Sequence, residues 1–399
     1  MKTWEQRKLS DIYASIGNAF VGTATPYYVE SGHFYLESNN IKDGQINHNS
    51  EIFINDEFYE KQKDKWLHTG DMVMVQSGHV GHAAVIPEEL DNSAAHALIM
   101  FRHPKEKIEP YFLNYQYQTN KSKKKIEEIT TGNTIKHILA SDMQEFVVDI
   151  TNYDEQKKIG SYFQKLDHLI TFHQRKCEQT KKLKKYMLQK MFPKEGQTVP
   201  EVRFEGFTDA WEKRKLGDIG SCQSGIGFPD AEQGGTEGIP FFKVSDMNLN
   251  GNEYELVYSN NYVTQEQIER KKWKPITEVP AIFFAKVGAA VMLNRKRLVN
   301  TPFLLDNNTM AYKFGNDWDT NFGRTLFDTI NLASLVQVGA LPSYNANDVE
   351  SIEIALPTIE EQKKIGEYFA NLDHLITLHQ RKCDELQNIK KFMLQNMFI

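Results

Sequence analysis

Short glycine-containing stretches in both halves of this chain carry the side chains best suited to contact a ligand. In the first half, Ser77, His79 and His82 surround two glycines, and in the second half Lys286 begins the stretch Lys-Val-Gly. Glycine lets a backbone approach a ligand closely. Hydroxyl, imidazole and ammonium groups offer donors that suit phosphate oxygens or the edges of nucleobases. One such stretch is usually a plain polar turn, but two at equivalent positions with different side chains indicate a pair of binding loops.

Two further groups of polar residues extend these candidate sites. The run Asn-Arg-Lys-Arg at 294–297 is the strongest basic cluster of the second half, and a third pair of matched loops spans 131–136 and 338–344. The candidate contact residues are therefore Ser77, His79, His82 and Lys136 in the first half, and Lys286, Asn294, Arg295, Arg297 and Tyr344 in the second.

Two His-x3-Cys pairs, His173 with Cys177 and His379 with Cys383, could supply four zinc ligands if they converged. The alternative is that all four residues lie in a helical seam, where the histidines act as polar residues that set the register. Structural zinc sites usually have shorter cysteine spacings. The spacing therefore favours the seam, and we expect no metal.

Motifs that would indicate catalysis are missing from the sequence. It contains no GxxxxGK[ST] phosphate loop, no GxGxxG, no GxSxG, no HExxH and no Asn/Asp-Pro-Pro-aromatic motif of an amino-methyltransferase. Pro229-Asp230 and Glu361-x-Lys363 resemble nuclease residues, but they lie far apart and the second pair falls in a predicted helix. We therefore expect no catalytic residue and no cofactor in this chain.

A long internal repeat positions these candidate loops. The segment 155–192 returns as 361–398, and 26 of 38 aligned residues are identical. The repeat also includes Trp4-Glu-Gln-Arg-Lys-Leu, which returns as Trp211-Glu-Lys-Arg-Lys-Leu. Such a repeat predicts a molecule built from two equivalent halves. Between the repeated segments the halves diverge, so a common frame carries different surface chemistry.

Each repeated segment has the pattern of a long coiled-coil helix. Asn152-x-x-Glu155 and Thr358-x-x-Glu361 predict capping boxes at the two starts. Apolar residues then follow at alternating spacings of four and three, which predicts a seam. At 1.5 Å per residue, 38 residues span about 57 Å. The predicted seam residues are Ile159, Phe163, Leu166 and Ile170 in the first copy, and Ile365, Phe369, Leu372 and Ile376 in the second. Equivalent halves most simply meet as an antiparallel pair, with one lobe near each end.

The remaining residues of each half predict a mixed, strand-rich α/β (α+β) lobe. Strands are expected at 72–75 and 83–86 in the first half, and at 281–284 and 291–293 in the second. One helix is expected in each of 111–128 and 321–335. The predicted domains are a lobe at 1–150, a helix at 151–193, a linker at 194–210, a second lobe at 211–356 and a helix at 357–399.

Charge is unevenly distributed along the chain. The net charge is −6, and residues 1–153 and 196–359 each carry 15 basic and 21 acidic groups, whereas 154–195 carry 11 and 5. A protein that binds DNA by neutralising phosphates alone would be more basic. The lysine run at 181–185 either touches the DNA backbone or an acidic partner, or forms a solvated helix face. The second copy lacks two of these lysines, which favours the solvated face.

Three cysteines without a CxxC pair, and the lack of a long apolar segment, predict a cytoplasmic protein with no membrane association.

Taken together, these motifs resemble the DNA-specificity subunit of type I restriction–modification systems. The resemblance rests on the doubled helix opening EQKKIG…LDHLI…HQRK, on WE[QK]RKL[SG]DI at the start of each half, and on the linker VRFEGFTDAW. The stretches GDMVMVQSGHVGHAAVI and AIFFAKVGAAVMLNRKR are also similar to those of the family. The resemblance covers essentially the whole chain. One departure is that the first half lacks the VRFEGF-type lead that precedes Trp211.

The resemblance implies two target recognition domains, each reading one half of a split double-stranded DNA site. It also implies that the helices set the spacer and dock two modification (methyltransferase) subunits, to which restriction subunits are added in some complexes. S-adenosylmethionine, ATP and magnesium would then be bound by those partners.

Two other readings stay open at this point. Acidic lobes also fit a protein–protein scaffold, which would show no salt-dependent DNA binding. A stand-alone nuclease would cleave DNA with a metal ion, and no motif in the sequence supports it.

Overall fold

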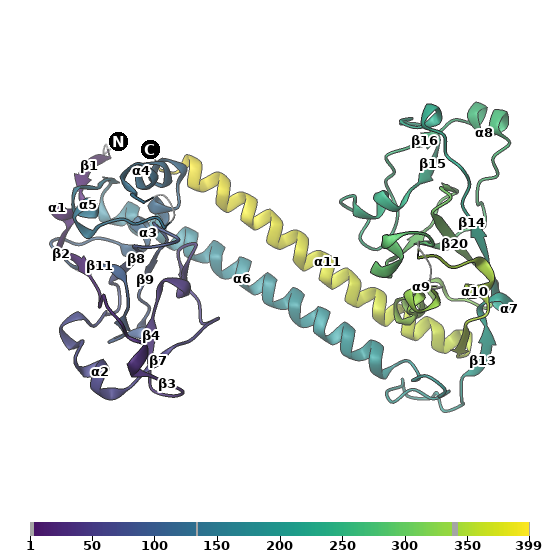
Figure 1. The fold of residues 1–399 in the computed structure, drawn as a ribbon, viewed down its shortest axis with the longest axis horizontal. Helices are drawn as coiled ribbons and strands as arrows, with labels where there is room; N and C mark the ends of the chain where they lie inside the picture. The colour runs from purple at the N-terminus through teal and green to yellow at the C-terminus, as the bar shows by residue number, and fades with distance from the viewer. Residues whose placement is uncertain (1–3, 133–134, 337–341, 399) are drawn as a thin grey trace. The chain divides into compact units, whose positions relative to one another are not determined.

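The computed structural model describes residues 4–132, 135–336 and 342–398. The chain forms two compact units, one made of residues 1–175 and 380–399 and the other of residues 176–379. We call them unit 1 and unit 2. Each unit holds one lobe, the first part of one long helix and the last part of the other (Figure 1). The two units are described separately below.

The lobe of unit 1, lobe one, is mixed α and β. Its elements are β1 (Glu5–Lys8), α1 (Leu9–Ile12), β2 (Tyr13–Asn18), β3 (Tyr28–Val29), β4 (His33–Leu36), β5 (Ile41–Lys42), β6 (Gln45–Ile46), β7 (Phe53–Ile54), α2 (Asp56–Glu60), β8 (Met72–Val75), β9 (Ala83–Val85), β10 (Ala94–Ala95), β11 (Leu98–Pro104), α3 (Pro110–Tyr117), α4 (Asn120–Ile129), α5 (Ala140–Glu145) and β12 (Val147–Ile150).

The lobe of unit 2, lobe two, repeats much of this order. Its elements are β13 (Glu212–Lys215), α7 (Leu216–Ile219), β14 (Gly220–Ser224), β15 (Ile239–Phe242), β16 (Tyr262–Val263), α8 (Gln265–Lys271), β17 (Ala281–Ala285), the 3-10 helix η7 (Ala289–Leu293), β18 (Lys296–Val299), β19 (Leu304–Leu305), β20 (Thr309–Phe314), α9 (Thr320–Thr329), the 3-10 helix η8 (Leu332–Leu335), α10 (Ala346–Glu350) and β21 (Glu353–Leu356).

The sheets confirm that the lobes are copies of one fold. The main sheet is four-stranded and antiparallel in both, with the order β2-β11-β8-β9 in lobe one and β14-β20-β17-β18 in lobe two. A second sheet has the order β10-β4-β7-β3 in lobe one and β16-β15-β19 in lobe two. The first and last strands of each lobe pair with each other, as β1-β12 and β13-β21.

Each main sheet is buried on both faces, because side chains alternate along a strand. In β8, Met72 and Met74 join the core that includes the long helices, whereas Val73 and Val75 join a smaller core on the other face. β17 divides its residues between two cores in the same way. The continuous apolar runs of the sequence therefore mark the central strands of the sheets.

Three local predictions were wrong. Val291–Leu293 is not a strand but the end of η7, and the paired strand is β18, a few residues later. The expected helix at 111–128 is two helices, because Thr119 caps the start of α4 with its side chain. The expected helix at 321–335 is α9 followed by the separate turn η8.

The two long helices, α6 (Tyr153–Lys190) and α11 (Ile359–Asn396), have 38 residues each. The Asn152 side chain accepts the backbone N–H of Glu155 at 3.1 Å, and Thr358 Oγ1 accepts that of Glu361 at 3.5 Å, as predicted for N-caps. A capping box also predicts that each glutamate side chain accepts the backbone N–H of the cap residue. In both copies the glutamate has other donors instead. Glu155 accepts from the Thr151 and Asn152 side chains, and Glu361 accepts from Arg203.

All eight predicted seam residues are buried, between 0% and 8% exposed. Those of α6 lie in the core of unit 1, with Cys383, Leu386 and Leu394 from the end of α11. In unit 2, Phe192 at the end of α6 packs 5.9 Å from Phe369 near the start of α11, measured between ring centroids. Within each unit the start of one helix therefore packs against the end of the other, which makes the helices antiparallel (Figure 1).

A buried carboxylate at the same repeat position pairs with a lysine of the opposite helix in each unit. In unit 1, Asp167 accepts from Lys390 at 2.6 Å and from the Tyr115 hydroxyl at 2.8 Å. In unit 2, Asp373 accepts from Lys184 at 2.9 Å and from Arg324 at 2.8 Å. Lys184 belongs to the lysine run of the sequence, so this member is mostly buried and paired within unit 2 and is not part of a solvated helix face.

Glycine at one repeat position lets each lobe approach its long helix. A Cβ at Gly366 would lie 2.5 Å from Asp319 Oδ1 and 2.7 Å from the Phe322 backbone nitrogen, at the start of α9. A Cβ at Gly160 would lie 3.3 Å from the backbone nitrogen of Phe112, in α3. The glycine of the EQKKIG opening is therefore a contact point between lobe and helix.

Phe163 is the residue of α6 on which packing in unit 1 depends most, since it is fully buried between Tyr115 and Phe398, whose ring centroids lie 4.9 and 6.0 Å away. We expect Phe163→Ala to lower the free energy of unfolding by about 3–5 kcal/mol in urea denaturation. Phe392→Ala, on an exposed face of α11, should change it by less than about 0.5 kcal/mol. Equal losses in the two variants would contradict this packing.

Candidate nucleic-acid interface

The two candidate loops of lobe one are joined by backbone hydrogen bonds. The Gly78 N–H donates to the Lys136 carbonyl at 3.0 Å, and the Ile138 N–H donates to the Gln76 carbonyl at 2.9 Å. Ser77 faces His137 in this short antiparallel bridge. The turn after β8 and the loop before α5, which were predicted as separate candidates, therefore form one surface.

Lobe two repeats the same bridge. The Gly288 N–H donates to the Pro342 carbonyl at 2.8 Å, the Tyr344 N–H donates to the Lys286 carbonyl at 3.3 Å, and Val287 faces Ser343. The predicted loops 131–136 and 338–344 include residues 133–134 and 338–341, which lie outside the described residues. The described parts show that equivalent loops meet in equivalent ways in both lobes.

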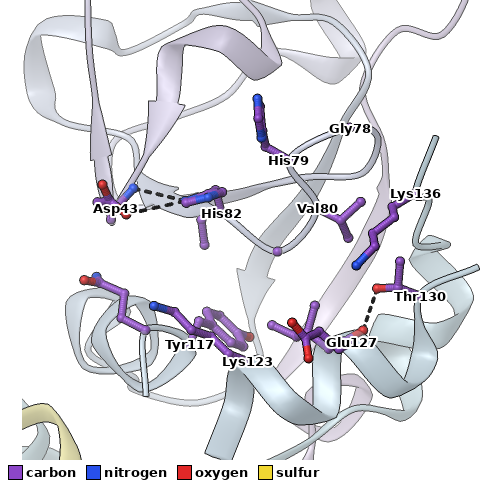
Figure 2. A pocket seen from close by; sticks show the side chains of 15 residues that line it. Asp43, Gly78, His79, Val80, His82, Tyr117, Lys123, Glu127, Thr130 and Lys136 are labelled. Carbon is purple, nitrogen blue, oxygen red and sulfur yellow. Dashed lines mark hydrogen bonds and ion pairs between the residues drawn. The ribbon is translucent and has the colours of Figure 1, made fainter. Parts of the chain in front are cut away.

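In lobe one these loops border a cavity of about 300 Å³ (Figure 2). Three of the four predicted residues, His79, His82 and Lys136, line it, and Ser77 precedes the lining residue Gly78. Lys123 and Glu127 of α4 and Asp43 of the β5–β6 turn complete its polar wall. The cavity thus gathers imidazole, ammonium and carboxylate groups from four segments of the lobe: the turn after β8, the loop before α5, α4 and the β5–β6 turn.

The imidazole of His82 has a fixed orientation in this cavity. The backbone N–H of Asp43 donates to His82 Nδ1 at 3.2 Å, so that nitrogen accepts and the neutral ring carries its proton on Nε2 (Figure 2). Burial lowers the pKa of His82, and His79 and Lys123 nearby lower it further, against the opposing effect of Asp43. His82 is therefore held as a neutral donor.

Gly81 is required by the shape of this turn. Its φ is +86°, in the left-handed region that glycine favours, and a Cβ there would lie 2.8 Å from Ile126 Cγ2 of α4. Gly81 thus lets the turn lie directly against α4, which forms the opposite wall of the cavity.

In lobe two, Asn294 and the buried lysine beside it stabilise the loop from within. Asn294 adopts a left-handed conformation, φ +51°, and its side chain donates to the Ile330 carbonyl at 3.2 Å. Its Oδ1 accepts the Leu332 N–H and the Lys296 ammonium, both at 2.9 Å. Burial lowers the pKa of Lys296 to about 8. These contacts tie the end of η7 to η8.

Arg297 and Tyr344 also have partners inside lobe two. The guanidinium of Arg297 donates to the carbonyls of Asn252, Lys296 and Met247, and burial lowers its pKa. Tyr344 is 5% exposed and donates to the Ala285 carbonyl at 2.6 Å. Arg295 is half-buried and donates to Asn248 Oδ1 at 2.6 Å. Lys286 lies on the bridge itself.

Sequence reasoning missed residues on both surfaces. Lys123 lines the cavity of lobe one, and the only signal for it was its place in a lysine-rich helix. Met292 and Leu293 are each 60% exposed at the end of η7 in lobe two, next to Asn294. We did not expect these two side chains to be exposed, because we predicted a strand at 291–293.

Among the residues that the structure describes, no group of three or more His, Cys, Asp or Glu side chains is placed to hold a metal ion. Cys177 lies in the seam, with its Sγ 3.8 Å from the Ile376 carbonyl. Within the same described ranges, the search for membrane-spanning segments found no helix with the required length and apolarity.

The protein thus contains two copies of one lobe, and each copy carries a pair of bridged loops with different side chains. This arrangement, with two long helices, is that of a binding protein with two related sites. The family model for the type I restriction modification DNA specificity domain matches residues 1–182 and again residues 208–388. The chain belongs to this family, and it is a DNA specificity subunit that recognises DNA by sequence.

Curated relatives agree with this assignment, and a solved structure shares the fold. A putative type I restriction enzyme MjaX specificity subunit of Methanocaldococcus jannaschii is 25% identical, and the match covers 97% of this chain and 91% of that protein. The MjaVIII specificity subunit of the same organism is 24% identical over 66% of this chain and 63% of its own. The crystal structure of a type I restriction–modification S subunit from M. genitalium shares the fold, with a TM-score of 0.65 at 15% identity, covering 100% and 96% of the two chains.

The lowered pKa of His82 predicts how the free energy of unfolding changes at acidic pH. Because the folded pKa lies below the unfolded value of about 6.5, His82 costs stability as pH falls through that value. Between pH 7.5 and 5.0, the free energy of unfolding should therefore fall more for the wild type than for His82→Gln, measured by urea denaturation at each pH.

His96 provides a control of opposite sign. Glu37, 3.1 Å from its Nδ1, is the main cause of its raised pKa. The stability that His96 contributes is present below pH 6.5 and lost as pH rises through its folded pKa. His96→Gln should therefore cost more stability at acidic than at alkaline pH. Identical pH slopes for wild type and His82→Gln would show that His82 is not held neutral.

Proposed function

We propose that each lobe reads one half of a bipartite DNA site through its bridged loops. The observation that carries this proposal is the equivalence of the two bridges, 76–78 with 136–138 and 286–288 with 342–344, combined with their different side chains. An equivalent backbone presents each loop pair in the same way, and different side chains then select different base sequences.

Within this proposal the candidate residues divide into two roles. Ser77, His79, His82 and Lys136, with Lys123, contact DNA from lobe one, and Lys286 and Arg295 contact it from lobe two. Asn294, Arg297 and Tyr344 instead maintain the shape of the lobe-two loops, since they donate to backbone carbonyls of the lobe, whereas Arg295 donates to the side chain of Asn248.

The lobes are acidic overall, so phosphate contacts must come largely from elsewhere in the complex. Partner subunits that close around the DNA would supply them. The same partners would carry the methyltransferase and endonuclease chemistry, with S-adenosylmethionine, ATP and magnesium, while this chain directs them to the site.

Exposed apolar residues on the long helices support docking of two modification subunits. Each unit has four such side chains, all between 37% and 64% exposed: Leu169, Phe172, Ile389 and Phe392 in unit 1, and Leu375, Leu378, Leu183 and Tyr186 in unit 2. Each residue in one unit is the repeat equivalent of one in the other. On each helix segment the two residues are three positions apart, so they share an outer face that is suited to pack against a partner helix.

The helices also set the distance between the half-sites in this proposal. Half-sites one helical turn apart on DNA, about 34–36 Å, face the same side of the duplex. Helices of 38 residues, about 57 Å long, are sufficient to span that distance.

Exchange of lobe one tests the assignment of half-sites. Replacing residues 1–150 with the corresponding lobe of another family member should change one half of the methylated sequence and leave the other half and the spacer unchanged. Methylation mapping of genomic DNA from cells that carry the exchanged chain and its partners measures this directly. Changes in both halves would refute a modular reading of the site.

Docking is tested by polar substitutions in one unit. Phe172→Ser with Phe392→Ser should reduce the number of bound modification subunits from two to one, measured by native mass spectrometry of the reconstituted complex. The equivalent pair in unit 2, Leu378→Ser with Tyr186→Ser, should give the same result at the other position. His168→Ser, at an exposed polar residue of α6, is the matched control and should leave two subunits bound.

A further inference from the structure

In unit 2, the linker that follows α6 covers the first turns of α11. The Arg203 guanidinium donates to both carboxylate oxygens of Glu361, from Nε at 2.7 Å and from Nη2 at 2.8 Å. Glu361 is 1% exposed under this contact. Two parallel N–H···O bonds between charged partners form one of the strongest and most directional contacts in proteins. The linker is therefore held to α11 by a specific recognition of its arginine.

The next residue of the linker makes the second contact. The Phe204 ring packs edge-on against Tyr368, with ring centroids 6.1 Å apart and planes at 75°. Glu361 and Tyr368 are seven residues apart, so they lie on one face of α11. An arginine followed by an aromatic residue thus matches a glutamate and a tyrosine two helical turns apart.

Unit 1 presents the same pair of residues on α6. Glu155 and Tyr162 are the repeat equivalents of Glu361 and Tyr368. Among the described residues, the hydrogen bonds to the Glu155 carboxylate come from Thr151 and Asn152, and both go to Oε2. The carboxylate is half-buried, whereas that of Glu361 is almost completely covered.

An open hollow lies beside Tyr162, where Phe204 packs against the equivalent tyrosine in unit 2. It has a volume of about 620 Å³. Its lining residues all come from one face of α6 and are Asp154, Lys157, Lys158, Ser161, Tyr162 and Lys165. Three lysines at its edge suit an acidic residue after the aromatic one, as Glu205 follows Phe204 in the linker.

We propose that the α6 surface formed by Glu155, Tyr162 and this hollow binds a peptide segment of a partner protein in which arginine is followed by an aromatic and an acidic residue. The carboxylate of Glu155 accepts the guanidinium, the ring of Tyr162 packs against the aromatic side chain, and the lysines face the acidic group. The contacts of Arg203 and Phe204 with α11 are the template for the first two of these interactions, and the third rests on the charge of the three lysines. The surface is separate from the exposed apolar residues assigned to modification subunits.

The test uses the full chain and a labelled peptide with the linker sequence 198–209, TVPEVRFEGFTD, in fluorescence anisotropy. We expect saturable binding with one site per chain. A peptide with Arg203→Gln should bind at least tenfold more weakly, because the bidentate contact is lost. Glu155→Gln and Tyr162→Ala in the protein should each weaken binding at least tenfold, whereas Glu178→Gln, at an exposed carboxylate of the same helix, should not change it.

A crosslinking experiment locates the bound peptide. A benzoylphenylalanine in place of Phe204 in the peptide should crosslink to residues 153–165 of the chain, as identified by mass spectrometry. Crosslinks near Tyr368 would show that the peptide displaces the linker in unit 2, and would overturn the proposal. Absence of saturable binding, or equal weakening by Glu155→Gln and Glu178→Gln, would also overturn it. Thermal melting of each variant separates lost binding from lost folding.

Discussion

The pairing of one buried carboxylate with a lysine from the other long helix determines how each unit is assembled. Asp167 and Asp373 lie among apolar seam residues, where an unpaired charge costs several kcal/mol. Lys390 and Lys184 can reach them only when the helices are antiparallel and in this register. A slip of one turn would keep many apolar contacts but separate both carboxylates from their lysines, leaving Asp167 only the Tyr115 hydroxyl and Asp373 only Arg324 among these partners. Apolar packing therefore supplies the stability, and these ion pairs select the arrangement.

Features that depend on local sequence were predictable, and features that depend on tertiary contacts were not. The long helices, their N-caps and their seam follow from spacing alone, and the structure confirms them. The strand expected at 291–293 failed because a short apolar run does not distinguish a strand from a turn of 3-10 helix. The predicted hydrogen bonds from the glutamate side chains to the cap residues were wrong for another reason. Glu361 is bound by Arg203, which is distant in sequence, and no local pattern reveals such a partner.

The candidate sites show the same division. Matching of the two halves identified loops that do meet in each lobe, since repeats preserve the frame. The role of each side chain was not predictable, because it depends on what surrounds it. His79, His82 and Lys136 border an open cavity, whereas Arg297 and Tyr344 bond to carbonyls inside lobe two. A basic residue in a loop is available to a ligand only if the backbone nearby leaves its donors without acceptors.

The composition of unit 1 has a consequence for synthesis of the protein on the ribosome. Lobe one is translated first, yet its core includes Cys383, Leu386 and Leu394 from the last twenty residues of the chain. Unit 2 is complete at residue 379, so it can reach its final packing earlier than the lobe that precedes it. Until residues 380–398 are synthesised, the apolar face of α6 near Phe163 lacks its contacts with α11 and Phe398 and is more prone to aggregation. Removal of residues 380–399 would thus take part of the core away from lobe one.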